Sequence, residues 1–385
     1  MRFDGLIASL SRRPLSERQR RLDEAFDTWL GGQVFPLTEG WRAVFIYKGP
    51  AREVLLVGDM TDWAPSLALR RLAGTDLLFR ELTFETDARL DYKLVVDGRW
   101  QRDPRNRRTM NSGSGANSEL RMPGYQTRPE VLPRRDIPRG RLERIEIAGQ
   151  ILRRPRRVTV YQPPGLTPGA RYRGLFFQDG SEYLSLGRAG RILDFMAMAD
   201  RFEAVGFFVH HADRSSDYSL NPAYADFFAT ELVPALESRY PVLVDPDSRA
   251  IIGDSLGGLI SAYILYRHPG IFGRFLSHSG AFNLAFQERI EYRGRLYDRE
   301  PFGRRVQEAR WPSRSFLVWG SYEHQAGDPD FTAGNGAFCD ALAANPSQKG
   351  LERRFYPQGH SWGLWRDTLR EGLKWLFEPG GDVLT

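Results

Sequence analysis

Strand-length apolar segments alternate with segments of helical periodicity through the C-terminal part of the chain, from about residue 143 to residue 385. The strand-like segments include "YRGLFFQDG", "AVGFFVHHAD", "SRAIIGDS", "FGRFLSHSG" and "SRSFLVWGS", and the helix-like segments include "GRILDFMAMADRF", "PAYADFFATELVPALESRY" and "LWRDTLREGLKWLF". This alternation predicts an α/β fold with a mostly parallel, doubly wound sheet covered on both faces. "RLERIEIAG" and "RRVTVYQPPG" are expected to add a leading antiparallel pair. Ligands of such sheets bind at the carboxyl ends of the strands.

The preceding residues predict a different organisation. Residues 35–125 contain short segments rich in β-branched and aromatic residues, such as "WRAVFIY", "EVLLVGD", "LLFRELTF" and "LDYKLVVDGRW", which predict a small all-β sandwich. Residues 1–34 predict a helical lead, because "SERQRRLDEAFDTWLGG" has helical periodicity and a Gly-Gly stop. Residues 126–142 are rich in Pro and Arg without periodicity and predict a linker. Residues 143–385 are expected to form the catalytic domain.

Composition excludes several function classes. No apolar stretch is long enough to cross a membrane, and the N-terminal residues lack a signal-peptide core, so we expect a cytoplasmic protein without a membrane partner. The single cysteine, Cys339, excludes an internal disulfide and a cysteine-clustered metal site. The formal charge is +6, with arginines interleaved among acids. The densest run, "RRPRR" at 153–157, is interpreted as a solvated strand edge or loop, not as a nucleic-acid patch. The net positive charge is compatible with an anionic substrate.

One pentapeptide carries the candidate chemistry: Gly253-Asp254-Ser255-Leu256-Gly257, a G-x-S-x-G pattern. It follows the apolar strand "AII" and precedes the helix "LGGLISAYILYRHP", which is the strand–turn–helix context of a serine nucleophile on a sharp turn. The small glycines fit where strand and helix crowd together. The alternative is an ordinary serine in a glycine-rich loop.

A serine nucleophile needs a base and an acid that orients the base. His360 follows the last strand and precedes the last helix, where the base of such a site belongs, and its alternative is a loop histidine. Glu323 follows the strand "SFLVWG" and is the favoured acid, ahead of Asp328 and Asp330. Its alternative is a surface residue paired to an arginine, with the enzyme running on a Ser–His dyad.

The N–H of Leu256 and the N–H of Ser181, in the loop after "LFFQDG", are the candidate donors of an oxyanion hole. This chemistry requires no metal and no cofactor.

Five segments in the C-terminal region carry a family resemblance: "FFQDG" at 176–180, residues 209–240, "IIGDSLGGL" at 251–259, "SHSG" at 277–280 and "GHSWGLWR" at 359–366. The region resembles the enterochelin-esterase-like esterases of the α/β-hydrolase fold, in the branch that includes feruloyl and acetyl-xylan esterases and mycolyl transferases.

The resemblance implies roles for further residues. Arg214, Asp217 and Tyr218 match an R-x-x-E/D-Y element that would shape the acyl pocket, the alternative being an internal salt bridge. With Trp362, Arg214 and Tyr218 are the candidate substrate-binding residues. The chain departs from the family at residues 281–283, where "AFN" stands in place of the aromatic residues of many relatives.

The N-terminal region has a resemblance of its own. "VLLVGDMTDW" and "YKLVVDGRWQRDPRNRR" resemble the early-set immunoglobulin-like modules that precede glycogen-branching enzymes and several esterases. Trp63 and Trp100 occupy positions at which some relatives bind glucans, and both residues fit equally well in the core of a sandwich.

The sequence therefore predicts a serine carboxylic-ester hydrolase acting on a small-molecule ester. An anionic or ferric catecholate siderophore is one candidate substrate, and a feruloyl or acetyl ester on a carbohydrate is the second. The alternative outside enzymes is a carbohydrate-binding protein with an inactive hydrolase domain. The sequence is compatible with a homo-oligomer and does not set the oligomeric state.

Overall fold

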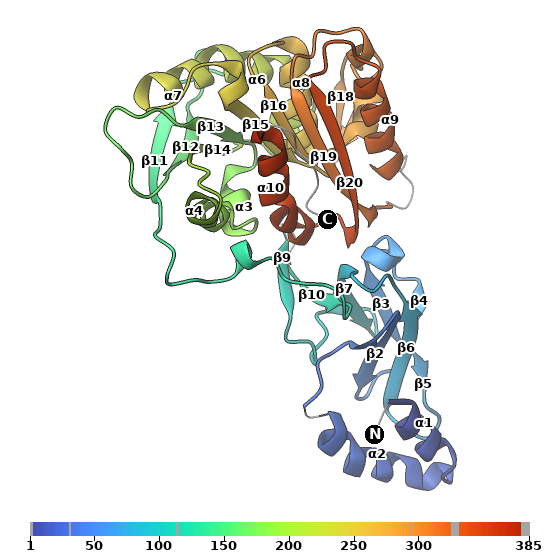
Figure 1. Cartoon of the computed structure of the whole chain (residues 1–385). Helices are drawn as coiled ribbons and strands as arrows, with labels where there is room; N and C mark the ends of the chain where they lie inside the picture. Colours follow the sequence, from blue (N-terminus) through green and yellow to red (C-terminus); the bar gives the residue numbers. More distant parts are fainter. Residues whose placement is uncertain (1–2, 31, 113–114, 293, 325–330, 379–385) are drawn as a thin grey trace. The chain divides into compact units, whose positions relative to one another are not determined.

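The computed structural model describes residues 3–30, 32–112, 115–292, 294–324 and 331–378 (Figure 1). The chain divides into two compact units. The first comprises Met1–Gln126 and Pro357–Ser361, and the second comprises Thr127–Tyr356 and Trp362–Thr385. None of the helices within the described ranges is both long enough and apolar enough to cross a membrane.

The first unit is built from two helices and two groups of antiparallel strands. One sheet has the order β1-β2-β6-β5, and in the other β7 pairs with β3, β8 and β10, with β4 and β9 outside. The elements are α1 (Phe3–Ser11), α2 (Leu15–Leu30), β1 (Leu37–Glu39), β2 (Arg42–Lys48), β3 (Val54–Gly58), β4 (Leu67–Ala68), β5 (Arg70–Arg71), β6 (Leu77–Thr83), β7 (Arg89–Val96), β8 (Arg99–Gln101), β9 (Thr109–Ser112) and β10 (Gly115–Arg121).

Apolar side chains hold these layers together. The ring of Phe45 on β2 meets the ring of Tyr92 on β7 edge to face, with centroids 5.0 Å apart, which joins the two sheets. The helical lead packs on the sheet that contains β6. The ring centroids of Phe3 on α1 and Phe79 on β6 are 5.2 Å apart. Residues of the helical lead therefore share a core with the strands.

The segment "LDYKLVVDGRW", one of the β-rich segments of the predicted sandwich, contains a turn. It forms two strands, β7 and β8, joined at Asp97 and Gly98. Both turn residues have positive φ, 47° and 81°, as a two-residue hairpin turn of the Asp-Gly type requires. The Asp-Gly pair was the signal for this turn.

The second unit is organised around one sheet with the order β11-β12-β14-β13-β15-β16-β19-β20. β11 and β12 form the expected leading antiparallel pair, and the strands from β14 through β19 in this order are parallel. The strands are β11 (Arg141–Ile147), β12 (Arg156–Gln162), β13 (Arg173–Phe177), β14 (Ala204–Val209), β15 (Arg249–Asp254), β16 (Arg274–His278), β19 (Arg314–Tyr322) and β20 (Gly350–Gly359), with a separate hairpin of β17 (Arg289–Tyr292) and β18 (Arg295–Asp298).

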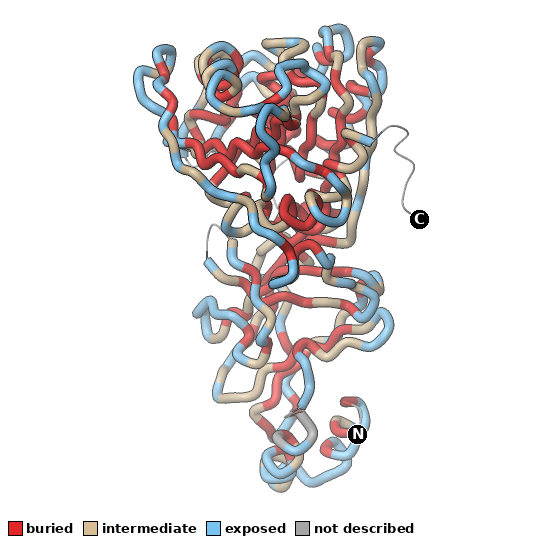
Figure 2. Tube along the Cα trace, turned by 60° about the vertical axis from the view of Figure 1, so that its left-hand side comes forward, coloured by how far each residue is buried: buried red, intermediate tan, exposed pale blue. Residues whose placement is uncertain are grey.

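Helices cover both faces of this sheet, as expected. Along β16, Leu276 packs against Gly372 of α10, whereas the next residue, Ser277, packs against Gly258 of α8. The strands between the helices are buried (red in Figure 2). The helices are α3 (Gly180–Ser185), α4 (Ala189–Ala199), α5 (Arg214–Tyr218), α6 (Pro222–Phe227), α7 (Val233–Arg239), α8 (Leu256–Arg267), α9 (Phe331–Ala343) and α10 (Trp362–Phe377).

The long helix predicted for "PAYADFFATELVPALESRY" contains an irregular turn. α6 is followed by a π-helical segment, Phe228–Leu232, and then by α7. Pro234 lies in the first turn of α7. Proline has no N–H and clashes with the carbonyl four residues earlier, so the turn before it widens.

The arginine run at 153–157 is not entirely solvated, which corrects its interpretation from sequence. Arg156 is buried, and its guanidinium donates to the carboxylate of Asp217 at 2.9 Å. Arg154 also donates to Asp217, at 2.8 Å. Asp217 is therefore the carboxylate of an internal ion pair with these arginines.

Candidate functional site

Ser255 lies at the turn between β15 and α8, at the carboxyl end of a central parallel strand. Its backbone has φ 52° and ψ −121°. Non-glycine residues adopt such a conformation at a cost of about 1–3 kcal/mol, and only where the surrounding structure enforces it. The Ser255 N–H donates to the carbonyl of His278, and the Ser255 carbonyl accepts from the N–H of Ala281, both at 2.9 Å. These bonds fix the turn to the segment after β16.

Two glycines leave room for this turn. A Cβ on Gly253 would lie 2.2 Å from the carbonyl oxygen of Gly257. A Cβ on Gly258 would lie 2.7 Å from Oγ of Ser277. Both distances are far below van der Waals contact, so strand and helix can approach this closely only with glycine at these positions.

The two expected oxyanion donors lie in the first turns of helices. Leu256 is the first residue of α8, and Ser181 is the second residue of α3. The first helical hydrogen bonds of α3 come from the N–H groups of Glu182 and Tyr183, which both donate to the carbonyl of Asp179. Ser181 precedes both of these donors. First-turn N–H groups have no intrahelical acceptor and favour negative charge near them.

A hydrogen bond to Tyr218 fixes the start of α3. The hydroxyl of Tyr218 accepts the N–H of Asp179 at 3.0 Å, and Asp179 has a left-handed backbone with φ 48°. Tyr218 is completely buried. In the described structure Tyr218 supports the backbone of Asp179. Direct contact between Tyr218 and a substrate stays a prediction.

A largely buried ionic group lies beside the Ser255 turn. Nε and Nη2 of Arg214 donate to the two carboxylate oxygens of Asp179, each at 2.8 Å. Nη2 of Arg214 also lies 3.5 Å from the carboxylate of Asp254, the residue before Ser255. Burial and the charge of Asp179 raise the pKa of Asp254 well above its usual range, against the pull of Arg214. Arg214 thus joins the α3 loop to the nucleophile turn.

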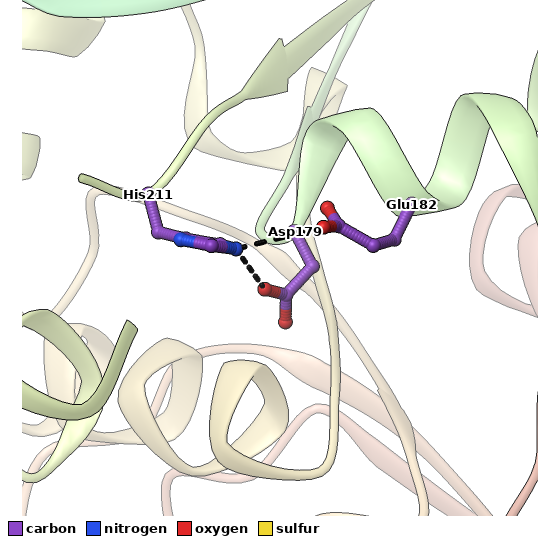
Figure 3. A group of neighbouring side chains, drawn as sticks. All are labelled: Asp179, Glu182 and His211. Carbon is purple, nitrogen blue, oxygen red and sulfur yellow. Dashed lines mark ion pairs between the residues drawn. The ribbon is translucent and has the colours of Figure 1, made fainter. Parts of the chain in front are cut away.

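One group of neighbouring side chains has the donor types of a metal site: Asp179, Glu182 and His211 (Figure 3). Nε2 of His211 lies 3.6 Å from one carboxylate oxygen of Asp179 and of Glu182. Glu182 raises the pKa of His211 by hydrogen bonding. Burial acts to raise the pKa of Glu182, but hydrogen bonds from His211 and Ser181 hold it at about 2. Both oxygens of Asp179 already accept from a guanidinium, so a cation would compete with that ion pair.

Glu323 lies just after β19 and is buried. Its Oε1 accepts from Oγ of Ser279 at 2.5 Å and from the N–H of Gly320 at 2.7 Å. Oγ of Ser279 in turn accepts from Nε1 of Trp365 at 2.9 Å. Glu323 is therefore not a surface residue. Asp328 and Asp330, the alternative acids, fall outside the described residues.

His360 follows β20 and precedes α10, in the order that the sequence predicts. It belongs to the five-residue segment grouped with the first unit, whereas Ser255 and Glu323 belong to the second. The next residue, Ser361, accepts a hydrogen bond from Nη1 of the buried Arg89 at 2.9 Å. The pairing of His360 with Ser255 and Glu323 stays a prediction.

Trp362 is buried at the start of α10. Its ring packs edge to face on Tyr183 at 5.2 Å and on Trp365 at 4.7 Å. The hydroxyl of Tyr183 also pairs with Nδ1 of His278 at 2.8 Å, and burial lowers the pKa of His278 to about 3. These contacts are structural, and a contact between Trp362 and a substrate stays a prediction.

Sequence reasoning did not single out Asp179, Asp254 or Ser279 as members of the site. The available signals were indirect. Asp179 and Ser279 stand in the "FFQDG" and "SHSG" segments, and Asp254 precedes the nucleophile. Their roles depend on partners far away in the chain.

The chain is similar to known esterases. Residues 149–376 match the family described as "Putative esterase". Iron(III) enterobactin esterase of Dickeya dadantii is 32% identical over 185 residues, which cover 45% of this chain and 40% of that protein. An uncharacterised Bacillus subtilis protein, YjcH, is 33% identical over 128 residues, which cover 31% of this chain and 53% of its own length. The chain spans about half the length of the curated relatives it matches.

The fold is also shared with solved structures. The enterobactin esterase of Shigella flexneri superposes with a TM-score of 0.73 at 21% identity, covering 91% of this chain and 98% of that one. The ferric enterobactin esterase of Salmonella typhimurium gives the same TM-score at 21% identity, with 94% and 100% covered. At this identity the likeness establishes the fold.

Proposed function

The chain belongs to the esterase family, and from that premise we propose that it hydrolyses carboxylic esters with Ser255 as the nucleophile. The observation that carries the proposal is the backbone of Ser255, held at φ 52° and ψ −121° between a buried strand and a buried helix. A strained strand-to-helix turn is how a serine nucleophile is exposed above a parallel sheet.

The proposed reaction has two steps. Oγ of Ser255 bonds to the ester carbonyl carbon while an imidazole nitrogen of His360 accepts the hydroxyl proton. The tetrahedral intermediate breaks its bond to the leaving alcohol, which takes the proton from His360. Water then attacks the acyl-enzyme with His360 again as base, releasing the acid and restoring Ser255. The N–H groups of Leu256 and Ser181 stabilise the oxyanion in both steps, and loss of one such donor costs about 3 kcal/mol.

Glu323 is the proposed orienting acid. Its burial and the two hydrogen bonds to its Oε1 support a fixed carboxylate at the end of β19. A carboxylate there would hold the tautomer of His360 and stabilise its charged form. Asp328 and Asp330 are the alternatives.

Arg214 is the proposed contact for an anionic substrate. Its side chain is 22% exposed, and Asp179 fixes the orientation of the guanidinium through two hydrogen bonds. Tyr218 and Trp362 are proposed to shape the acyl pocket. Both side chains are buried, which is consistent with positioning the residues that line the pocket.

A catecholate siderophore ester is the proposed substrate class. The support is that several relatives are named enterobactin esterases. A feruloyl ester is the second candidate, since a ferulic acid esterase shares the fold with a TM-score of 0.55.

The first unit is proposed to be an early-set immunoglobulin-like module. Its two antiparallel sheets support this assignment. Trp100 is 51% exposed and can stack on a sugar, whereas Nε1 of Trp63 donates to Asp59. Glucan binding by the first unit should therefore be lost in Trp100→Ala.

The test is a substrate panel: p-nitrophenyl butyrate, ferric enterobactin and methyl ferulate. Wild type is compared with Ser255→Ala and with Ser238→Ala, a matched control because Ser238 is exposed on α7. Hydrolysis that is lost in Ser255→Ala and kept in Ser238→Ala supports the proposal. A folded wild type with no activity on any ester contradicts it, and the preferred substrate decides between the two classes.

A further inference from the structure

The second unit contains a cavity of about 480 Å³ that the proposed ester chemistry does not use. It is lined by residues of the segment 133–142, of β12 and of the helices α3 and α4. Among the described residues, the lining includes neither Ser255 nor Glu323. The cavity meets the end of α3 at Ser185, whereas the predicted oxyanion donor Ser181 lies at its start.

The lining is strongly cationic. Four arginines contribute to it: Arg134, Arg139, Arg188 and Arg191. The guanidinium groups of Arg188 and Arg191 each donate to the carbonyl of Val131 at 3.0 Å. This shared acceptor orients two of the four groups before any ligand arrives, and the guanidinium of Arg191 has further N–H donors to offer.

One carboxylate, that of Asp194, opposes these arginines in the lining. Its Oδ1 accepts from the hydroxyl of Tyr161 at 2.8 Å and from the N–H of Gly140 at 2.7 Å. These two bonds hold the carboxylate in place. Arg134 is paired with Asp136, which lies outside the lining. The other three arginines still outnumber the one lining carboxylate, so the cavity favours an incoming anion.

The start of α4 adds to this preference. Gly190, the second residue of the helix, lines the cavity, and no side chain caps this end of α4. The N–H groups of an uncapped first turn favour a negative group. The remaining lining is apolar, with Ile137, Leu142 and Leu184 contributing. The cavity therefore offers an anion-binding side and an apolar side.

We propose that this cavity binds a small organic dianion with an apolar body, either an aryl or alkyl phosphate or an aromatic dicarboxylate. The arginines bind the two negative charges through charge-assisted hydrogen bonds, which guanidinium groups form with both phosphate and carboxylate. The apolar side chains contact the ring or chain. The volume falls within the range of small-molecule sites and far exceeds that of one phosphate ion.

Isothermal titration calorimetry at pH 8 tests the proposal with two probes, phenyl phosphate and phthalate. Inorganic phosphate serves as the probe without an apolar body, and phenyl phosphate is expected to bind about tenfold more tightly. The preferred probe distinguishes a phosphate from a dicarboxylate ligand. Hydrolysis of p-nitrophenyl butyrate by the same samples reports separately on the proposed function.

Three variants make the test specific. Arg191→Gln is expected to weaken binding about tenfold, because a hydrogen bond to a charged group is lost. Arg310→Gln, at an exposed arginine outside the lining, is expected to bind as wild type does. Asp194→Asn keeps an acceptor for Tyr161 and Gly140 but removes the opposing charge, so binding should tighten at least threefold.

Each other outcome overturns the proposal. Absence of binding by both organic probes to the folded wild type would leave the cavity without this ligand class. Wild-type affinity in Arg191→Gln would show that the probe binds elsewhere. An equal loss in Arg310→Gln would reduce the binding to general attraction by a cationic protein.

Discussion

Replacement of Ser255 by glycine and by alanine separates the strain of the turn from its chemistry. Both variants lack the Oγ nucleophile, so both should be inactive toward p-nitrophenyl butyrate. They differ in the backbone conformation that they tolerate. Alanine has to keep φ 52° and ψ −121° at the same cost as serine, whereas glycine adopts that conformation freely.

The magnitude follows from two opposing terms. Relief of the strained backbone contributes about 1–3 kcal/mol. The greater freedom of glycine in the unfolded chain takes back about 0.4–1 kcal/mol. Ser255→Gly should therefore exceed Ser255→Ala in free energy of unfolding by about 1 kcal/mol, which corresponds to roughly 2–4 °C in Tm for a unit of this size.

The assay is urea and thermal unfolding of both variants, followed by circular dichroism, with hydrolysis measured on the same samples. A glycine variant that is no more stable than the alanine variant would refute the reasoning. The turn would then be relaxed, and the conformation of Ser255 would no longer support an activated serine.

Three further predictions concern the surroundings of the site and the first unit. Gly253→Ala should lower the free energy of unfolding by more than about 2 kcal/mol and abolish hydrolysis, because the added Cβ would collide with the carbonyl of Gly257. Urea unfolding with a near-normal midpoint, together with near-normal activity, would argue against this close contact. Burial lowers the pKa of His278 from 6.5 to about 3, so the neutral form contributes stability above pH 6.5 that is lost as the pH falls toward 3, by at most about 5 kcal/mol. In urea titrations across this range, His278→Asn should show a weaker pH dependence than wild type, and an unchanged dependence would count against a neutral buried imidazole. Arg89→Met should destabilise the first unit by about 3–5 kcal/mol, because the buried carboxylate of Asp91 loses its cation and that of Glu119 keeps only its pairing with Arg121. A calorimetric loss below about 1 kcal/mol would contradict this.

Local patterns made much of the second unit predictable. The apolar "AII", the glycines and the helix before Pro269 are adjacent in the chain, so the turn at Ser255 follows from short-range sterics. The antiparallel pair of β11 and β12 follows from two neighbouring β-rich segments in the same way. The Asp97-Gly98 turn was equally local, and its signal was passed over.

Interactions between distant residues were not predictable from one sequence. Asp179, Arg214 and Asp254 meet only after three strands and their helices have packed, and no periodicity marks them as partners. The same holds for the bond between Ser279 and Glu323, 44 residues apart. Buried charge requires a partner, but a single sequence does not say which residue supplies it.

The central claim is that Ser255 is an activated nucleophile, and covalent labelling tests it most directly. Wild type and Ser255→Ala are treated with a fluorophosphonate, and the modified peptide is identified by mass spectrometry. We expect one adduct in wild type, on the peptide that contains Ser255, with loss of hydrolysis in step with labelling. Labelling of a different serine, or hydrolysis that persists in Ser255→Ala, would contradict the account.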